Sequence, residues 1–195
     1  MLDYSETERI ILSCGAFKAE RIGIEDVVLN RGFFAMCEEN RCGLFDRCYM
    51  CPPCIGNIDD LILKVRSYSG GILYQTVLGL DNPTDIEEML SKTKVHMDIS
   101  QKIQRMIADA GAEDFLHLST GGCGLCDICA RVTDEPCRYP DKAMSSLEAY
   151  GIDVCKTASA TSLKYDNGYG TVTFFGIILA KDIQGCIPQS GAADN

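Results

Sequence analysis

The residues with the clearest chemical pattern are four cysteines in the second half of the chain. Cys123, Cys126 and Cys129 follow one another at gaps of two residues, and Cys137 comes after seven more. Three thiolates at this spacing converge within one loop, and bacterial ferredoxins use the same spacing for three corners of a four-iron cluster. The pattern therefore predicts iron–sulfur ligation here, with Cys137 as a candidate fourth ligand.

Two glycines flank the first of these cysteines. Gly122 and Gly124 allow the backbone to approach a cluster and to turn its amides toward the cluster sulfides, so we expect both to be cofactor-binding residues. Zinc is the alternative, because it also takes four thiolates, in a closed and redox-silent site. Zinc sites usually pair two separated Cys-x2-Cys knuckles, and the run of three favours [4Fe-4S] over zinc.

A second group of cysteines lies earlier in the chain. Its five members are Cys37, Cys42, Cys48, Cys51 and Cys54. A four-iron cluster takes four cysteine ligands, so either one thiol is spare or the site is unusual. Pro52-Pro53 stiffens the loop and removes two amide donors, which suits a rigid metal site. For Cys48 and Cys54 alone, a role as small, partly buried apolar residues is equally consistent with the pattern.

Composition and charge restrict where this chemistry takes place. The 195 residues include 12 cysteines, and the acidic start of the chain is unlike a signal peptide, so we expect a cytoplasmic, reducing compartment. Disulfides are rare there, which leaves metal binding as the main role for the cysteines. A net charge of −10 without a basic stripe argues against nucleic acid. The longest apolar run, 172–180, is too short to cross a membrane.

Hydrophobic spacing predicts the elements that must position these cysteines. Apolar residues at helical spacing indicate helices, and branched or aromatic runs bounded by glycines indicate strands. We expect helices over 5–14, 57–66, 84–110 and 143–150, strands over 72–78, 115–118 and 171–180, and an extended segment over 19–29. The strand at 115–118 would lead directly into the second cysteine group.

These elements predict an α+β fold. We expect a single mixed or antiparallel sheet, with helices on one side and two cysteine-rich metal-binding loops, 37–54 and 123–137. One domain would span residues 1–183, and 184–195 would form a flexible tail, because that segment holds little apolar content.

Several residues that attract attention are expected to have ordinary roles. His96 is predicted to lie on the surface near a break in the long helix, and His117 to be an ordinary strand residue rather than a cluster ligand. Cys14, Cys155 and Cys186 stand apart from the two groups and are expected to be small apolar fillers. Cys155 is the exception to consider, because it is close in sequence to the second group.

Longer strings of residues resemble a known family. They are Cys37-x4-Cys42-Gly43, Cys51-Pro52-Pro53, Gly121-Gly122-Cys123-x2-Cys126-x2-Cys129, Pro136-Cys137-Arg138-x-Pro140 and the segment from Ser146 to Val154. On these strings the chain resembles the predicted metal-binding proteins of domain of unknown function 2284, which occur mainly in anaerobic bacteria and archaea. The resemblance covers residues 15–179 and implies metal binding through these cysteines.

The chain departs from that family pattern inside the first cysteine group. Phe45-Asp46 and Tyr49 stand where a Tyr-Gly pair and a Trp are expected, and Cys48 and Cys54 are additions. An extra pair of thiolates would complete a cluster in a different way or bind something larger than one four-iron cluster.

Three functions are compatible with these observations. The first is electron transfer to a redox partner protein by one or two [4Fe-4S] clusters per chain. The second is an enzyme in which one cluster iron lacks a cysteine and binds substrate, in a redox or Lewis-acid reaction. The third is a zinc-stapled interaction module. A homodimer is compatible with each of them, and neither the membrane nor nucleic acid is an expected partner.

Overall fold

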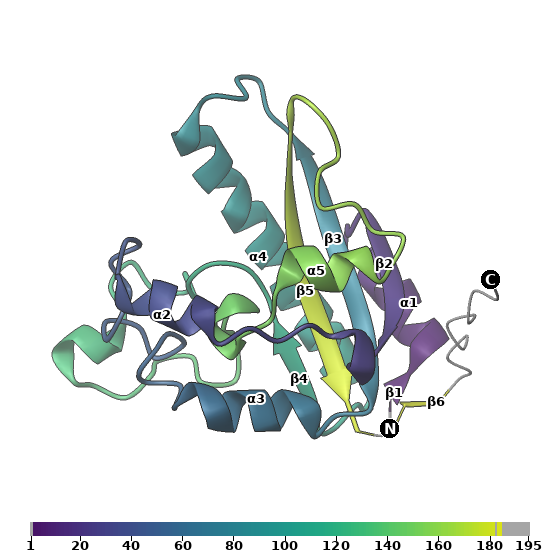
Figure 1. Ribbon diagram of the computed structural model, residues 1–195, viewed down its shortest axis with the longest axis horizontal. Helices are drawn as coiled ribbons and strands as arrows, with labels where there is room; N and C mark the ends of the chain where they lie inside the picture. Colours follow the sequence, from purple (N-terminus) through teal and green to yellow (C-terminus); the bar gives the residue numbers. More distant parts are fainter. Residues whose placement is uncertain (1, 182, 185–195) are drawn as a thin grey trace.

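A single four-stranded sheet forms the centre of the protein. The computed structural model describes residues 2–181 and 183–184 (Figure 1). The strands are β2 (Lys18–Gly23), β3 (Gly70–Gly79), β4 (Phe115–Leu118) and β5 (Thr171–Ala180), in the order β2-β3-β5-β4. Every neighbouring pair is antiparallel, which confirms the predicted α+β class and the antiparallel form of the sheet.

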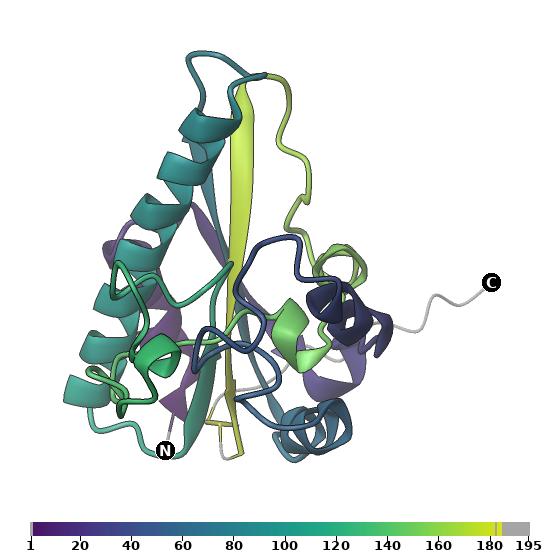
Figure 2. The same ribbon diagram turned by 90° about the vertical axis from the view of Figure 1, so that its left-hand side faces the viewer.

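Helices cover both faces of this sheet. The helices α1 (Tyr4–Ser13) and α4 (Ile86–Asp109) pack on one face, and α3 (Ile58–Arg66) and α5 (Val154–Ser159) pack on the other (Figure 2). Side chains alternate along a strand, so Leu73 lies in the core beneath α3 while its neighbour Tyr74 lies in the core beneath α4. The expectation of helices on one side is therefore wrong, because both faces of the central strands are apolar.

The long helix is continuous. Asp85 caps it by accepting hydrogen bonds from the amides of Glu87 and Glu88, and the predicted span is confirmed. The predicted break near His96 is absent, and His96 is fully buried rather than on the surface. His96 lies on the same buried face of α4 as Ile99 and Ile103, and this face packs against the sheet.

Other predicted elements are largely confirmed. The helices at 5–14 and 57–66 correspond to α1 and α3, and the Asn57 side chain accepts from the Asp60 amide, as an N-cap does. The extended segment at 19–29 is β2 followed by the 3-10 turn η1 (Ile24–Asp26). A short parallel pair, β1 (Leu2–Asp3) with β6 (Ile183–Gln184), contains the first residue of the predicted tail, and 185–195 lie outside the described residues.

One local prediction is wrong. The segment 143–150 is not a helix: it is mostly irregular and ends in the 3-10 turn η3 (Glu148–Tyr150). Its apolar residues are buried at helical spacing, but Ser146 forms a bridge with Ser119 in an extended conformation. The short helix α2 (Gly32–Glu38) begins before the first cysteine group, in a stretch for which no element was predicted.

A buried polar network links the sheet to the start of the second cysteine loop. The Tyr74 hydroxyl lies 2.8 Å from His117 Nε2 and 2.7 Å from Ser100 Oγ, and Ser100 Oγ lies 2.9 Å from Ser119 Oγ. His117 lies on strand β4, as predicted. Gly176 faces Tyr74 across the ladder and leaves room for its ring. The network therefore fixes Ser119, which lies immediately beyond β4.

Candidate metal centre

The second cysteine loop begins at this fixed point. The Ser119 amide donates to the Ser145 carbonyl at 3.0 Å, and the Ser119 carbonyl accepts from the Leu147 amide at 3.1 Å. Gly121 and Gly124 then adopt φ angles of +65° and +64°, which glycine tolerates best. The loop returns through the 3-10 turn η2 (Ala130–Thr133), whose buried Ala130 anchors the segment after Cys129.

Turns fold the first cysteine loop on itself. Cys37 lies in the last turn of α2, and its carbonyl accepts from the Asn40 amide at 3.0 Å. The Asp46 amide donates to the Pro52 carbonyl at 2.9 Å, which joins the two ends of the segment that contains Cys48. This loop has little regular structure of its own, and backbone turns hold its cysteines in place.

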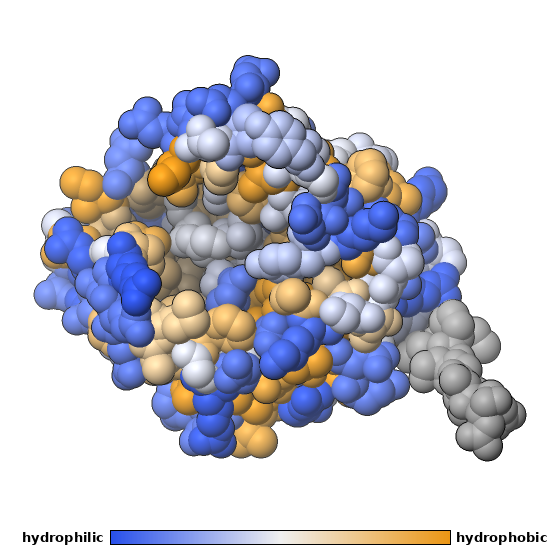
Figure 3. Space-filling view, turned by 45° about the horizontal axis from the view of Figure 1, so that its top comes forward, coloured by the Kyte–Doolittle hydropathy of each residue, from blue (hydrophilic) through white to orange (hydrophobic). Residues whose placement is uncertain are grey.

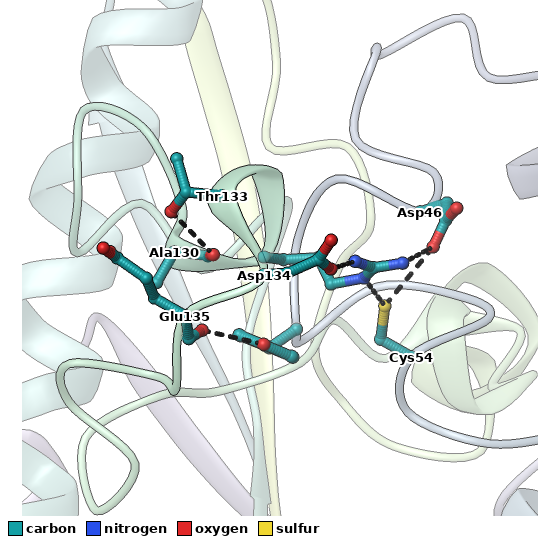
Figure 4. Close-up of polar contacts among 8 residues, drawn as sticks. Asp46, Cys54, Ala130, Thr133, Asp134 and Glu135 are labelled. Atoms are coloured by element: carbon teal, nitrogen blue, oxygen red, sulfur yellow. Dashed lines mark hydrogen bonds and ion pairs between the residues drawn. The ribbon is translucent and has the colours of Figure 1, made fainter.

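The two loops, far apart in sequence, pack against each other. The Tyr49 hydroxyl donates to the Glu135 carbonyl at 2.8 Å, a contact drawn in Figure 4. Gly122 lies so close to Leu44 that a Cβ atom there would lie 2.3 Å from Leu44 Cδ1. The sequence suggested two separate cysteine groups, whereas the structure joins them at one interface.

Arg131 carries most of the charge contacts across this interface. Its Nε donates to Cys54 Sγ at 3.3 Å and its Nη2 donates to Asp46 at 2.8 Å, while Nη1 pairs with Asp134 of its own loop (Figure 4). These hydrogen bonds, above all the one to Cys54, raise the pKa of Arg131 above its ordinary value. The guanidinium therefore fixes Cys54 from the opposite loop.

The loops line a half-open cavity of about 410 Å³. The cysteines that line it are Cys48, Cys123, Cys126, Cys129 and Cys137. The space-filling view shows a hollow on the left-hand side of the molecule, the side that carries both loops in Figure 1, with hydrophobic and hydrophilic residues around it (Figure 3). Four of the five thiols come from the second loop, and Cys48 joins them from the first.

The thiols of this region influence one another. The Cys51 thiol donates to Cys48, which lowers the pKa of Cys48 and raises that of Cys51. The amides of Met50 and Cys123 also point at the Cys48 sulfur, as does the Cys129 thiol. Cys48 is only 4% exposed, so a sulfur that receives donors from both loops is nearly closed off from solvent.

The remaining predicted ligands lie around this pair. Burial raises the pKa of Cys123, although the amides of Leu125 and Met144 point at its sulfur. Burial also raises the pKa of Cys37, and the negative charges of Cys42 and Glu148 add to this shift. All described cysteines are free thiols.

The donor set fits a thiolate-bound metal centre. Cysteines line one cavity, and backbone amides act on the sulfurs of two of them, which is compatible with thiolate ligation of a metal. Within the described residues, no three or more His, Cys, Asp or Glu side chains are arranged to hold a single metal ion. Metal ligation by the nine cysteines of the two groups therefore stays a prediction.

The isolated cysteines lie elsewhere. Cys14 contacts the sulfur of Met106 at 3.4 Å, between α1 and α4, and Cys155 is exposed on α5. Neither lines the cavity, and Cys186 falls outside the described residues.

Sequence reasoning missed the arginines of the site. Arg131 binds Cys54, and a hydrogen bond to Cys126 raises the pKa of Arg138. The available signal was their position in an acidic chain, with Arg131 two residues after Cys129 and Arg138 directly after Cys137. The sequence contains no comparable signal for the contact between the two loops, because that contact depends on the tertiary fold.

Comparison with known proteins adds one match. No curated protein and no solved structure matches the chain. Among the described residues, no helix is long and apolar enough to cross a membrane. The family model described as predicted metal-binding protein (DUF2284) matches residues 20–180, most of the 195-residue chain, and includes both cysteine loops. The chain therefore belongs to the DUF2284 family of predicted metal-binding proteins.

Proposed function

We propose that this protein is a cytoplasmic iron–sulfur protein that transfers electrons to a redox partner protein. The cavity between the two loops carries the proposal, because it has a volume of about 410 Å³ and five cysteines line it. A structural zinc ion is enclosed by four ligands at about 2.0–2.3 Å and needs no such space. A water molecule occupies about 30 Å³ of the liquid, so the cavity is sized for a group of many atoms.

Residues of the chain supply ligation and tuning in this proposal. A bound cluster would accept and release single electrons, and cysteine thiolates would hold it. The amides of Met50 and Cys123 at Cys48, and those of Leu125 and Met144 at Cys123, are donors that stabilise a more reduced, more negative cluster. Arg138 adds a positive charge beside Cys126. These donors and this positive charge would raise the reduction potential of the bound cluster.

The surface around the second loop supports the role of a protein partner. Ile128 is 64% exposed, and the side chains of Val132 and Tyr139 beside it are also exposed. All three residues line the cavity, so this apolar surface lies next to the proposed cluster. Exposed apolar residues grouped around a redox centre favour contact with another protein, either a redox partner or a second copy of this chain.

Metal analysis of anaerobically purified protein tests the proposal. Iron, sulfide and zinc would be determined together with visible absorption and electron paramagnetic resonance (EPR) spectra before and after dithionite. We expect a brown protein with about four or eight irons per chain, matching sulfide, and an EPR signal that appears on reduction. A colourless protein with stoichiometric zinc would contradict the proposal and favour the zinc-stapled interaction module.

A further inference from the structure

A chain of buried hydroxyl groups links the sheet and α4 to the start of the second cysteine loop. Ser100 Oγ, on α4, lies 2.7 Å from the Tyr74 hydroxyl and 2.9 Å from Ser119 Oγ. It also lies 3.0 Å from the carbonyl oxygen of His96, one turn earlier in the helix. Tyr74, Ser100 and Ser119 are no more than 1% exposed. Each hydroxyl hydrogen must therefore find its acceptor inside the protein.

The carbonyl oxygen of His96 determines the direction of these hydrogen bonds. A carbonyl oxygen only accepts, so Ser100 donates its single hydroxyl hydrogen to it. Ser100 Oγ then accepts from Tyr74 on one side and from Ser119 on the other. Because the Tyr74 hydrogen points to Ser100, the Tyr74 oxygen accepts from His117 Nε2 at 2.8 Å. This assignment is the only one that places one hydrogen in each of the four contacts.

The same assignment fixes the tautomer of His117. Burial lowers the pKa of His117 to about 3, so the ring is neutral at pH 7 and carries its one hydrogen on Nε2. His117 Nδ1 is then a bare acceptor, and among the described residues it has no hydrogen-bond partner. The other tautomer would bury an N–H group without an acceptor. His96 takes the same form, because its Nε2 donates to the Phe175 carbonyl and its Nδ1 accepts from the Thr76 hydroxyl at 2.9 Å.

Ser119 connects this chain to the cysteine loop. Its hydroxyl donates to Ser100, and its backbone amide and carbonyl bond to Ser145 and Leu147. The residue is therefore held from three directions at the point where β4 ends. Cys123, four residues later, lines the cavity. A rotation of Ser119 would redirect the loop, and with it the Cys123 thiol.

We propose that Tyr74, Ser100 and Ser119 are positioning residues, and that their hydrogen-bond chain sets the path by which the second cysteine loop enters the cavity. The described residues that line the cavity include none of the three, so they act only through the loop. The inference rests on the proposed iron–sulfur function and adds to it a control of the reduction potential from the sheet. Hydrogen bonds that orient the ligands of a metal centre tune its potential in this way.

NMR of the histidine rings tests the direction of the chain. The sequence contains only two histidines, so protein labelled with nitrogen-15 histidine gives two ring systems. We expect both rings to carry hydrogen on Nε2 and none on Nδ1 at pH 7. In Tyr74→Phe the His117 Nε2–H group loses its acceptor, so the His117 signals should shift much more than those of His96. Hydrogen on His117 Nδ1 in the wild-type protein would overturn the inference.

The variant Ser119→Ala tests the link to the loop. Amide exchange across 121–129 should accelerate by about fivefold or more, with little change in β3, because one buried hydrogen bond is lost. The reduction potential of the cluster should shift, and Tyr74→Phe should shift it in the same direction, because both variants disturb the same chain. Tyr4→Phe is the matched control: the Tyr4 hydroxyl is buried and has no hydrogen-bond partner among the described residues, so neither quantity should change.

The outcomes separate this inference from the proposed function. Unchanged exchange and potential in Ser119→Ala, or a change of equal size in Tyr4→Phe, would overturn the positioning role while the proposed function stands. A protein without iron and sulfide would refute the proposed function and the control of its potential. The tautomer of His117 and the exchange rates would then still decide whether the chain positions the loop.

Discussion

The sheet and the cysteine loops differ in what holds them together. The sheet packs helices on both faces, and several buried polar groups form hydrogen bonds there, as between Tyr74 and Ser100 or between His96 and the Phe175 carbonyl at 3.1 Å. The two loops contain little regular structure and meet through a few contacts, mainly those of Arg131 and Tyr49. Burial therefore accounts for the sheet, whereas the loops bring cysteine thiols together around the cavity that we propose holds a cluster.

From this difference we expect bound metal to stabilise only the half of the molecule that contains the loops. A sheet with two apolar cores is stabilised by burial and requires no metal. The loops resemble small metal-dependent domains, in which the binding free energy of the metal is also the free energy of folding. The following predictions test this contrast.

Removal of the metal should produce the largest effect. In the apo protein, amide hydrogen exchange across 37–54 and 121–137 should accelerate by at least about 1,000-fold, because thiolate–metal binding contributes several kcal/mol to local folding. Exchange in β3 and β5 should change little. Hydrogen-exchange mass spectrometry of holo and apo protein measures both regions at once. Equal acceleration of exchange in the sheet and in the loops would contradict the claim that metal stabilises only the loops.

Acid should act on the sheet through its two histidines. Burial lowers the pKa of His96 to about 4 and that of His117 to about 3, so both are neutral when folded but protonated below about pH 6.5 when unfolded. The unfolded state then binds more protons, and stability is full above pH 6.5 and falls as the pH drops toward 4. When the pH falls from 7 to 5, each histidine should lower the free energy of unfolding by roughly 2 kcal/mol.

Denaturant unfolding at pH 7 and pH 5 measures this loss. The variant His117→Gln should be less stable at pH 7 but should lose less stability on acidification than the wild type. Acid damage to a cluster would affect both proteins equally, so the difference between them isolates the histidine. An identical pH dependence in the variant would refute this assignment.

Packing beside Tyr74 should be sensitive to a single methyl group. A Cβ atom on Gly176 would lie 2.2 Å from the Tyr74 ring, so Gly176→Ala should destabilise the protein by about 1–3 kcal/mol. The control is Gly79→Ala at the far end of β3, where a Cβ atom meets nothing within 4 Å. Thermal unfolding compares the two variants, and equal midpoints would show that Tyr74 can move aside.

The interface between the loops should give a smaller, local effect. Arg131→Ala removes the hydrogen bonds to Cys54 and Asp46, and amide exchange should accelerate several-fold in both loops but not in the sheet. Arg9→Ala, which removes an exposed pair with Glu6, is the matched control and should change neither region. Unchanged exchange in the Arg131 variant would mean that other contacts hold the interface.

Sequence patterns predicted the sheet half better than the loop half. Hydrophobic spacing and caps such as Asn57 and Asp85 mark α3 and α4, because local energetics and burial agree there. The predicted helix at 143–150 was wrong, because residues such as Met144 and Leu147 are buried at helical spacing although the backbone there is not helical. His96 was predicted to lie on the surface near a helix break, whereas it lies within the continuous helix α4 and is fully buried.

The cysteine groups were recognised, but their three-dimensional arrangement was not. Spacing predicts which thiols share a loop, and it correctly grouped Cys123, Cys126 and Cys129 around one cavity. It could not assign Cys48 to that cavity, because this depends on how a segment about 80 residues away folds back across the interface. The short helix α2 was missed for a related reason: it buries no residue fully and has no side-chain cap.

X-ray absorption at the iron edge of the anaerobically purified protein tests the central claim most directly. If the cavity between the loops holds a cluster, the iron should have a first shell dominated by sulfur and a second shell of neighbouring iron atoms. Replacement of Cys129, which lines the cavity and contacts Cys48, should remove iron from the sample. Iron bound mainly by oxygen or nitrogen without iron neighbours, or zinc with four sulfurs in its place, would contradict the account.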